Sequence, residues 1–531
     1  MQKAISAWLV LLLLLLAYTA SWAGGPSGQG GPRPPDIMTA PEGTYFVWEA
    51  KEPADVTYLC HANLGGRNLA ILVLNSSGLY RLLALDARTG SELASSTNFT
   101  CSPYRLCPVG DYLVALCQDE VSYYLLVLNS SLNLVFSSRF DVPLEGPWCI
   151  SPSSFLCLAN KTLFAYSLED MSVKWSLSFR EANFLTVLPI GEAILVLRHS
   201  GPTWLACRVS PEDGTLLSEA ELDWLSWASG TALLSYNASC LLTWAWNESL
   251  NQVSLVHLDE LRPSWTWSSS ILSYVLVIPD LDGDRAPDIM VLSASGSRTD
   301  LGIISGSTGH ELLSARKDLE AVSALWAGDH KAFLVAEDGV YLEELNLMRG
   351  EVRDLWHLPC SHACLLADLD GDGFSELLAS EGNLVMCVWG SYDESPPLVS
   401  ASWPPDGFST SVPGVLLKAR VEDHGSGVRR VVFVVDGREV DATYDGGYYV
   451  AYVRLSEGIH EWSVKAIDKV GLSASDGPRH ITVNMSFFGE PGWEDDVLFF
   501  GPWAAALIAL AVLVLRKKLG RPEGSQSSAL T

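Results

Sequence analysis

The chain carries LYRLLALDARTGSELA at residues 79–94, in which a short apolar run, a turn and a second short run follow one another. The first run is too short for a typical helix and ends at turn-forming residues, so it predicts a β-strand. Segments of the same form recur at intervals of about 40–50 residues, the length expected of a repeat protein. Further examples are TLFAYSLEDMSVKWSLSF (162–179), WLACRVSPEDGTLLSEAEL (204–222) and LGIISGSTGHELLSA (301–315).

Eight candidate units start near residues 56, 101, 145, 184, 224, 266, 319 and 360. A unit of about 42 residues with four short strands has the size of a propeller blade. One blade cannot bury both of its faces, so neighbouring blades must stack around an axis and the ring must close. The last unit, residues 360–389, is short of one strand, which the isolated segment YFVW (45–48) would supply. We therefore expect an all-β fold with a β-propeller over residues 44–390. Eight blades are favoured, and seven blades or an array of two-sheet sandwiches are the alternatives.

The segments LLALDARTGSEL and LFAYSLEDMSVKWSL resemble the PQQ-like (quinoprotein-type) propeller repeat, in which a strand, an Asp-x-x-Thr-Gly turn and a Trp-bearing strand recur. The resemblance extends over most of residues 56–345 and follows the motif at Asp86, Thr89 and Gly90. It implies a propeller. Enzymes of that family commonly have a disulfide between adjacent cysteines beside the quinone. No two of the 11 cysteines are adjacent here, which argues against a quinone cofactor.

Two acidic segments, DLDGDRAPD (280–288) and DLDGDGFSE (368–376), place carboxylates at positions 1, 3, 5 and 9. Ca²⁺ takes 6 to 8 oxygen ligands, and a tight loop with this alternation can supply them, with a backbone carbonyl at position 7. The candidate calcium ligands are Asp280, Asp282, Asp284, Ala286, Asp288, Asp368, Asp370, Asp372, Phe374 and Glu376. Two solvated acidic turns are the alternative.

An EF-hand does not fit these segments, because it requires a Glu at position 12 and a following helix, whereas strand-like residues follow here. The loops instead resemble the FG-GAP repeats of integrin α-subunit propellers, which implies structural calcium between blade strands. They begin 88 residues apart, which matches two repeats. Arg285 replaces the glycine expected at position 6, so the first site is expected to be weaker, and Glu376 replaces the usual Asp.

Both chain ends carry apolar segments. Residues 1–23 have a basic start, a short apolar run and small residues before the cleavage point, which indicates a secretory signal peptide. Residues 24–43 form a Gly/Pro-rich linker. Residues 497–515 are free of charge, would span about 28 Å as a helix, and precede a basic segment at 516–521. The pattern predicts a single-pass type I membrane protein with residues 516–531 in the cytoplasm. An uncleaved N-terminal anchor and a buried C-terminal helix are the alternatives.

The region between these ends has features of an exported protein. All 11 cysteines precede the C-terminal apolar segment, and an oxidising compartment would pair many of them. Cys101/Cys107, Cys149/Cys157 and Cys360/Cys364 are close enough in sequence to close short loops, but spacing does not fix the connectivity. Seven glycosylation sequons also precede that segment, at Asn75, Asn98, Asn129, Asn160, Asn237, Asn247 and Asn484.

Residues 397–486 differ in character from the repeat, because five or more runs there alternate apolar and polar residues. This pattern suits an immunoglobulin-like (Ig-like) β-sandwich. The segments DHGSGV (423–428), DG (436–437) and AIDKVG (466–471) resemble Ig-like modules of prokaryotic, including archaeal, surface proteins. We expect this domain to hold the propeller away from the membrane, and a second ligand-binding module is the alternative.

The net charge of −28 argues against a nucleic-acid partner, which would need a basic face. The sequence contains no HExxH, GxSxG, P-loop or Rossmann fingerprint, so we expect no catalytic site. The function expected is binding of a protein or glycan at the cell surface, in adhesion or recognition. An exported propeller enzyme, either quinone-dependent or hydrolytic, is the alternative. A binding face would show clustered tryptophans, for which the candidates are Trp224, Trp227, Trp244, Trp246, Trp265 and Trp267, although we expect most of them to pack the blades.

Overall fold

A computed structural model of the chain describes residues 40–484, except residues 202 and 238. The chain divides into two compact units, with the boundary between Asp393 and Glu394. Across the described residues, no helix has the length and hydrophobicity needed to cross a bilayer. The one helical element described is the short 3₁₀ turn η1 (Asp223–Leu225). The predicted signal peptide, transmembrane segment and cytoplasmic tail lie outside the described residues, as does most of the linker.

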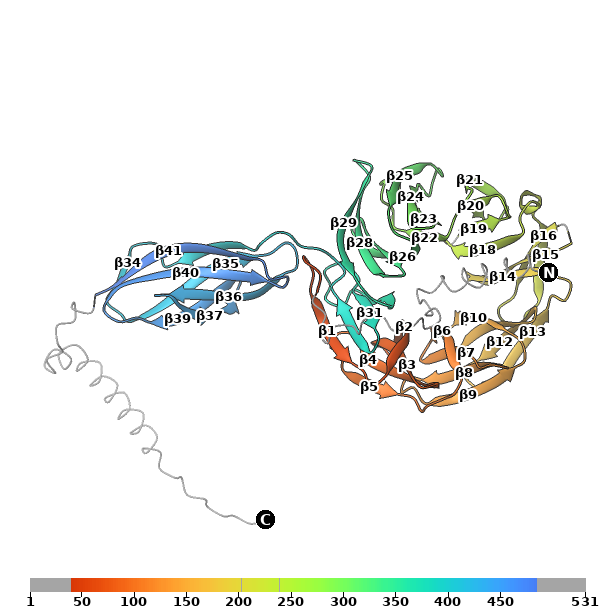
Figure 1. The fold of residues 1–531 in the computed structure, drawn as a ribbon, viewed down its shortest axis with the longest axis horizontal. Coiled ribbons are helices and arrows are strands. Elements are labelled where there is room, and N and C mark those ends of the chain that lie inside the picture. The colour runs from red at the N-terminus through yellow and green to blue at the C-terminus, as the bar shows by residue number, and fades with distance from the viewer. Residues whose placement is uncertain (1–39, 202, 238, 485–531) are drawn as a thin grey trace, which may run out of the picture. The chain divides into compact units, whose positions relative to one another are not determined.

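In the first unit, eight four-stranded antiparallel sheets form a ring, with the first strand of each blade toward the interior and the last toward the outside (Figure 1). Blade 1 comprises β2 (Asp55–Leu64), β3 (Arg67–Ser76), β4 (Leu79–Asp86) and β5 (Glu92–Ser95), and blade 2 comprises β6 (Ser102–Val109), β7 (Tyr112–Gln118), β8 (Tyr123–Asn129) and β9 (Leu134–Phe140). Blade 3 comprises β10 (Leu144–Ser151), β11 (Ser154–Ala159), β12 (Thr162–Ser167) and β13 (Val173–Ser178), and blade 4 comprises β14 (Phe184–Ile190), β15 (Ala193–Ser200), β16 (Thr203–Val209) and β17 (Leu216–Glu221).

The other four blades continue the ring. Blade 5 comprises β18 (Gly230–Ser235), β19 (Cys240–Trp246), β20 (Asn251–His257) and β21 (Pro263–Ser269), and blade 6 comprises β22 (Tyr274–Ile278), β23 (Asp288–Ser295), β24 (Arg298–Ile304) and β25 (Glu311–Lys317). Blade 7 comprises β26 (Ala321–Gly328), β27 (Lys331–Ala336), β28 (Gly339–Asn346) and β29 (Glu351–Leu358), and blade 8 comprises β30 (His362–Leu365), β31 (Leu377–Glu381) and β32 (Leu384–Val388) with β1 (Phe46–Lys51). The expectation of a propeller with eight blades is confirmed for the described residues.

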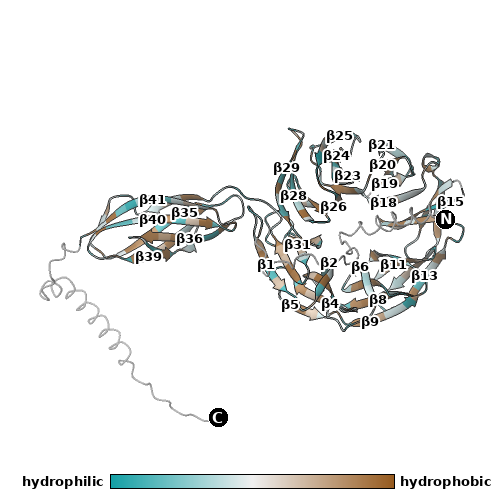
Figure 2. Cartoon of the chain, in the orientation of Figure 1, coloured by the Kyte–Doolittle hydropathy of each residue, from teal (hydrophilic) through white to brown (hydrophobic). Residues whose placement is uncertain are grey.

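Burial follows the position of a strand within its blade. All six residues of β11 are buried, whereas all six of β17 are exposed. A middle strand is covered by a neighbouring blade on each face and reads as a continuous apolar run, but an outer strand faces solvent. This difference in burial explains why the middle strands give the strongest signal in the sequence. Hydrophobic stretches, drawn in brown, occur in strands of both units (Figure 2).

The N-terminal strand closes the ring. β1 pairs antiparallel with β32 and becomes the outermost strand of blade 8, and β2 contacts the inner strands β6 and β30 on its two sides. The backbone N–H of Trp389 donates to the carbonyl of Tyr45 at 3.0 Å, and the two rings stack with centroids 5.4 Å apart. The prediction that residues 45–48 complete the last blade is therefore confirmed.

A repeated tryptophan contact joins neighbouring blades. An indole N–H on the outermost strand of one blade donates to a backbone carbonyl in the last turn of the next blade, at 2.7–3.2 Å. The pairs are Trp48 with Ala87, Trp175 with Pro211, Trp265 with Gly306, and Trp356 with Ser391. In the first three cases the indole lies against a turn glycine, where an added Cβ would come within 2.5–2.7 Å of the ring. Close approach of the indole thus explains the glycines in the recurring turn.

The second unit consists of two sheets around a shared core. One sheet has the order β33-β35-β39-β38 and the other the order β34-β41-β40-β36-β37, in which β34 pairs parallel with β41. The fully buried Phe433 and Trp462 belong to the core. The strands of the two sheets are β33 (Leu398–Trp403), β34 (Phe408–Thr410), β35 (Gly414–Glu422), β36 (Val428–Val435), β37 (Arg438–Asp441), β38 (Thr443–Asp445), β39 (Tyr448–Arg454), β40 (Gly458–Asp468) and β41 (Ser473–Val483). A two-sheet domain is observed, and its Ig-like assignment stays a prediction.

Candidate metal centres and a cavity between two blades

The two acidic loops occupy the same place in two blades. Each connects the first strand of its blade to the second: β22 to β23 in blade 6, and β30 to β31 in blade 8. In the first loop, carboxylate oxygens of Asp280, Asp282 and Asp288 all lie within 4.8 Å of one another. In the second loop the residues at the same positions, Asp368, Asp370 and Glu376, do the same. Three carboxylates at such distances repel one another, and a divalent cation among them would offset the repulsion.

Both loops are held by the same internal hydrogen bonds. The carboxylate at position 1 accepts from the backbone N–H groups of positions 4 and 6, at 2.7 and 2.7 Å in the first loop and 2.6 and 3.0 Å in the second. The carboxylate at position 9 accepts from the N–H of position 2, at 2.8 Å in both loops. These bonds fold each loop back on itself, which explains how residues eight positions apart come together.

The position-5 carboxylates point elsewhere. Asp284 accepts hydrogen bonds from the hydroxyls of Ser305, at 3.2 Å, and Ser307, and the bond from Ser307 lowers its pKa. Asp372 accepts from the indole N–H of Trp389 at 2.5 Å, and burial raises its pKa. Neither belongs to the three-carboxylate cluster of its loop. They connect each loop to a later segment of its own blade.

The position-7 residues carry no oxygen in their side chains and could contribute only backbone oxygen to an ion. The backbone N–H of Ala286 donates to Asp284 at 2.7 Å, and that of Phe374 donates to Asp372 at 2.9 Å.

The position-9 carboxylates are the buried members. Asp288 is 0% exposed and Glu376 is 1% exposed. Burial raises the pKa of Asp288 and raises the pKa of Glu376 to about 7, with further contributions from neighbouring carboxylates. A bound cation would favour the ionised form of both groups.

Position 6 has a left-handed backbone in both loops, although the residue differs. Arg285 has φ +74° and Gly373 has φ +93°, so both lie in the left-handed region. A non-glycine residue there costs about 1 kcal/mol, which disfavours the first loop.

The cysteines do not pair as their spacing suggested. No disulfide joins any of the 11 cysteines, all of which lie in the described residues. Cys101, which precedes β6, instead has a side-chain hydrogen bond with Cys117 of the neighbouring strand β7, and this bond lowers the pKa of Cys101. Both side chains are buried in one hydrophobic cluster. Pairing of the cysteines as disulfides stays a prediction, and Cys117 joins Cys107 as a candidate partner of Cys101.

Two further expectations concern the surface. None of the seven sequon asparagines is buried; Asn98, Asn160, Asn237 and Asn484 are exposed, and the other three are partly buried. Their glycosylation stays a prediction. Of the six candidate tryptophans, most of which were expected to pack the blades, Trp244 is buried and the other five are partly buried. They mainly pack the blades.

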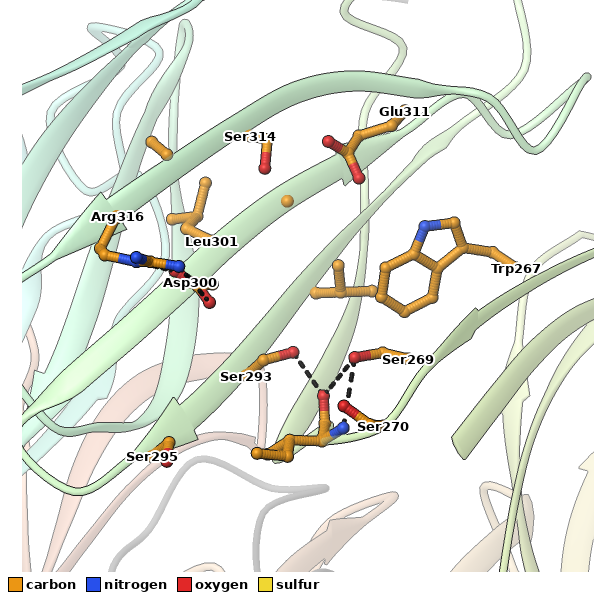
Figure 3. Close-up of a pocket in the computed structure, with 14 residues that line it drawn as sticks. Trp267, Ser269, Ser270, Ser293, Ser295, Asp300, Leu301, Glu311, Ser314 and Arg316 are labelled. Carbon is orange, nitrogen blue, oxygen red and sulfur yellow. Dashed lines mark hydrogen bonds and ion pairs between the residues drawn. The ribbon is translucent and has the colours of Figure 1, made fainter. Parts of the chain in front are cut away.

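Trp267 packs against the hydrophobic cluster between blades 5 and 6 and also lines a cavity of about 410 Å³ between these blades. Its other walls come from β23, β24 and β25, with serine hydroxyls, the carboxylate of Glu311 and the ion pair Asp300–Arg316 (Figure 3). Sequence reasoning did not find this cavity. Its one visible signal was Gly302, which stands within a strand otherwise rich in large residues.

The ring of four-stranded sheets defines the chain as a β-propeller protein. Residues 249–329, which include the first acidic loop and the cavity walls, match the family model described as FAM234A/B beta-propeller. Protein FAM234A of Rattus norvegicus is 45% identical over 49 residues, covering 9% of this chain and 9% of that protein. Protein FAM234A of Bos taurus is 39% identical over 67 residues, covering 11% and 12%. The chain thus aligns with only about a tenth of the length of these curated relatives.

Among solved structures, the crystal structure of BamB from Moraxella catarrhalis is similar to the chain, with 14% identity and a TM-score of 0.44. The similarity covers 65% of this chain and 99% of BamB.

Proposed function

We propose that the chain is a membrane-anchored extracellular protein whose propeller binds a protein or glycan at the cell surface and is stabilised by calcium in two loops. The observation that carries this proposal is the paired clusters, Asp280/Asp282/Asp288 and Asp368/Asp370/Glu376, formed at the same place in two blades. A single acidic turn could be a solvated surface feature. Two loops with the same positions, hydrogen bonds and buried ninth carboxylate are better explained by a shared ligand, and oxygen-only donors suit Ca²⁺.

The location follows from the ends of the sequence and from its charge. A signal-like N-terminus, a C-terminal apolar segment with a basic flank, and sequons only between them support export with one C-terminal span. A net charge of −28 suits an extracellular protein in a medium rich in divalent cations. The second unit would then be an Ig-like stalk between the propeller and the membrane.

The experiment uses the full chain expressed in cultured animal cells. An antibody to an N-terminal tag placed after residue 23 should label intact cells, whereas one to a C-terminal tag should label only permeabilised cells. Labelling of the C-terminal tag on intact cells would contradict the topology.

Purified chain should melt at a higher temperature in calcium than in a chelator. Replacing Asp368 and Asp370 together by Asn should reduce that difference, whereas Glu120→Gln, at an exposed turn, should leave it unchanged. Equal melting temperatures with and without calcium would contradict the calcium part of the proposal.

A further inference from the structure

The cavity beside Trp267 exists because the blade repeat departs from its own pattern. On the third strand of blade 6, Gly302 pairs with Val291 of the second strand. The residue at this place in three other blades is larger and fully buried, and fills the space against the preceding blade. The corresponding pairs are Leu83 with Leu72, Cys207 with Val196, and Met386 with Ala379. Gly302 has no side chain at this place; an added Cβ would lie 2.9 Å from Cγ2 of Val291, and both residues line the cavity.

The outermost strand of blade 5, β21, which lies across the cavity from blade 6, departs from the pattern too. Two residues after the tryptophan that joins the blades, three other blades carry the aliphatic residues Ala50, Leu177 and Leu358. Blade 5 carries Trp267, which is partly buried and lines the cavity. Ser293 of blade 6 pairs with Asp300, at the place where Leu74 pairs with Arg81 in blade 1. Trp267 still packs against the hydrophobic cluster between the two blades, but beside this contact the walls form a polar cavity with one aromatic side.

Several polar groups of the cavity are paired with one another. Arg316 forms a two-point ion pair with Asp300 at 2.6 and 3.3 Å, on the side of the cavity opposite Trp267 (Figure 3). The hydroxyls of Ser269 and Ser293 both donate to the carbonyl of Ile271, at 2.7 and 2.6 Å. The two serine hydroxyls are thus oriented by one backbone carbonyl, which reduces the ordering cost of binding, whereas the side chains of Arg316 and Asp300 are mostly exposed.

These features match the chemistry of a sugar. A pyranose ring presents C–H groups on one face and hydroxyls around its edge. The indole of Trp267 offers a flat apolar surface, and Arg316, Glu311 and Ser314 offer donors and acceptors for hydroxyls. Because Asp300 offsets the charge of Arg316, Glu311 leaves the walls with a net negative charge, which disfavours sialylated or sulfated sugars. The volume falls in the range of small-ligand sites.

We propose that this cavity binds a neutral sugar residue of a cell-surface glycan, stacked on Trp267. The inference rests on the proposed function. Of the two kinds of ligand proposed there, protein or glycan, it selects the glycan and places its binding site in this cavity.

The test uses the full chain purified in detergent, in calcium, on an array of immobilised oligosaccharides ending in neutral hexose, N-acetylhexosamine or sialic acid. The wild-type chain should bind neutral termini and not sialylated ones. Calorimetry with the best neutral oligosaccharide should show about tenfold or weaker affinity for Trp267→Ala, a change of about 1.4 kcal/mol. Ser293→Leu, which introduces the residue that blade 1 has at this place, should block the cavity without removing its aromatic wall.

Leu177→Ala is the matched control, since it truncates the corresponding residue between blades 3 and 4. It should lose stability and keep the affinity of the wild-type chain. Melting curves of all variants separate loss of binding from loss of fold. Binding of neutral sugars that survives both Trp267→Ala and Ser293→Leu would overturn the inference, as would the absence of neutral-sugar binding by the wild-type chain. The calcium-dependent melting shift and the topology tags test the proposed function independently of either result.

Discussion

The indole N–H of Trp48 donates a 2.7 Å hydrogen bond to the carbonyl oxygen of Ala87, and this bond joins the last blade to the first. Trp48 lies on β1, which the backbone ladder attaches to blade 8, whereas Ala87 lies in the turn after β4 of blade 1. The short strand β1 therefore contacts both blades, 8 and 1, that meet where the ring closes. Trp48 is buried, with 8% of its surface exposed.

Trp48→Ala should destabilise the propeller by about 3–5 kcal/mol, the usual cost of truncating a buried aromatic residue. Trp48→Phe should cost less, because it keeps part of the packing and loses the hydrogen bond, worth about 1 kcal/mol. Urea unfolding followed by tryptophan fluorescence measures both. Val47→Ala, at an exposed position on the same strand, is the control. An unchanged unfolding midpoint for Trp48→Ala would show that β1 does not hold the ring closed.

The proximity of Cys101 and Cys117 predicts a disulfide under the oxidising conditions of the proposed extracellular location. Thiol–disulfide exchange with glutathione disulfide or an oxidised protein would join the two sulfurs and release two reduced thiols. The bond would close a loop of about 16 residues and stabilise the fold by about 3 kcal/mol. Non-reducing peptide mapping of the secreted-pathway protein should find this link. A reductant should lower its melting temperature but leave that of Cys101→Ser unchanged. A Cys101–Cys107 link in the map would refute this pairing.

The second unit should become less stable as the pH rises past neutrality. Nδ1 of His460 lies 2.6 Å from a carboxylate oxygen of Asp436, and Nε2 lies 2.9 Å from the carbonyl oxygen of Ser456. The bond to Asp436 raises the pKa of His460. The stabilisation is thus fully present below the unfolded-state pKa of about 6.5 and is lost as the pH rises through the higher folded-state pKa.

Unfolding of the full chain between pH 5.5 and 8.5 measures this effect, which should stay below about 1 kcal/mol because Asp436 is half-exposed. His460→Gln should remove this part of the pH dependence, whereas His424→Gln, at an exposed position, should keep it. A wild-type profile that rises over the same interval would contradict the assignment.

Arg285 predicts unequal affinity of the two loops. Because its φ of +74° suits glycine, Arg285→Gly should remove about 1 kcal/mol of backbone strain and tighten calcium binding at the first loop. Gly373→Ala should have the opposite effect at the second loop. Calcium titrations of the two variants provide the comparison. If neither substitution changes affinity, the backbone at position 6 does not limit binding.

Much of the fold could be predicted from the sequence, because each blade repeats the same burial pattern. Predicted unit starts fall within two residues of the observed first strands in six blades. The starts near 224 and 266 were early for two reasons. Apolar residues around Trp224 form the turn η1 before blade 5, and the run at 263–269 is the last strand of blade 5 rather than the first of blade 6. A local sequence pattern predicts a strand but does not show to which blade the strand belongs.

The acidic loops were visible in the sequence as spacing, but the direction of each side chain was not. Asp372 points to Trp389, and Asp284 to serines 21 and 23 residues further on, so contacts outside the loop decide their orientation. The role of Gly302 in the cavity could likewise not be predicted from the sequence, because it becomes clear only when the strand registers of different blades are compared.

The number of calcium ions bound per chain tests the paired loops most directly. After dialysis of the purified full chain against micromolar calcium, elemental analysis should find two ions per chain. One ion should be lost in a variant with Asp280 and Asp282 replaced by Asn, and the other in a variant with Asp368 and Asp370 replaced by Asn. A calcium content in the wild-type chain no higher than in a variant with all four substitutions would contradict the assignment of the loops as calcium sites.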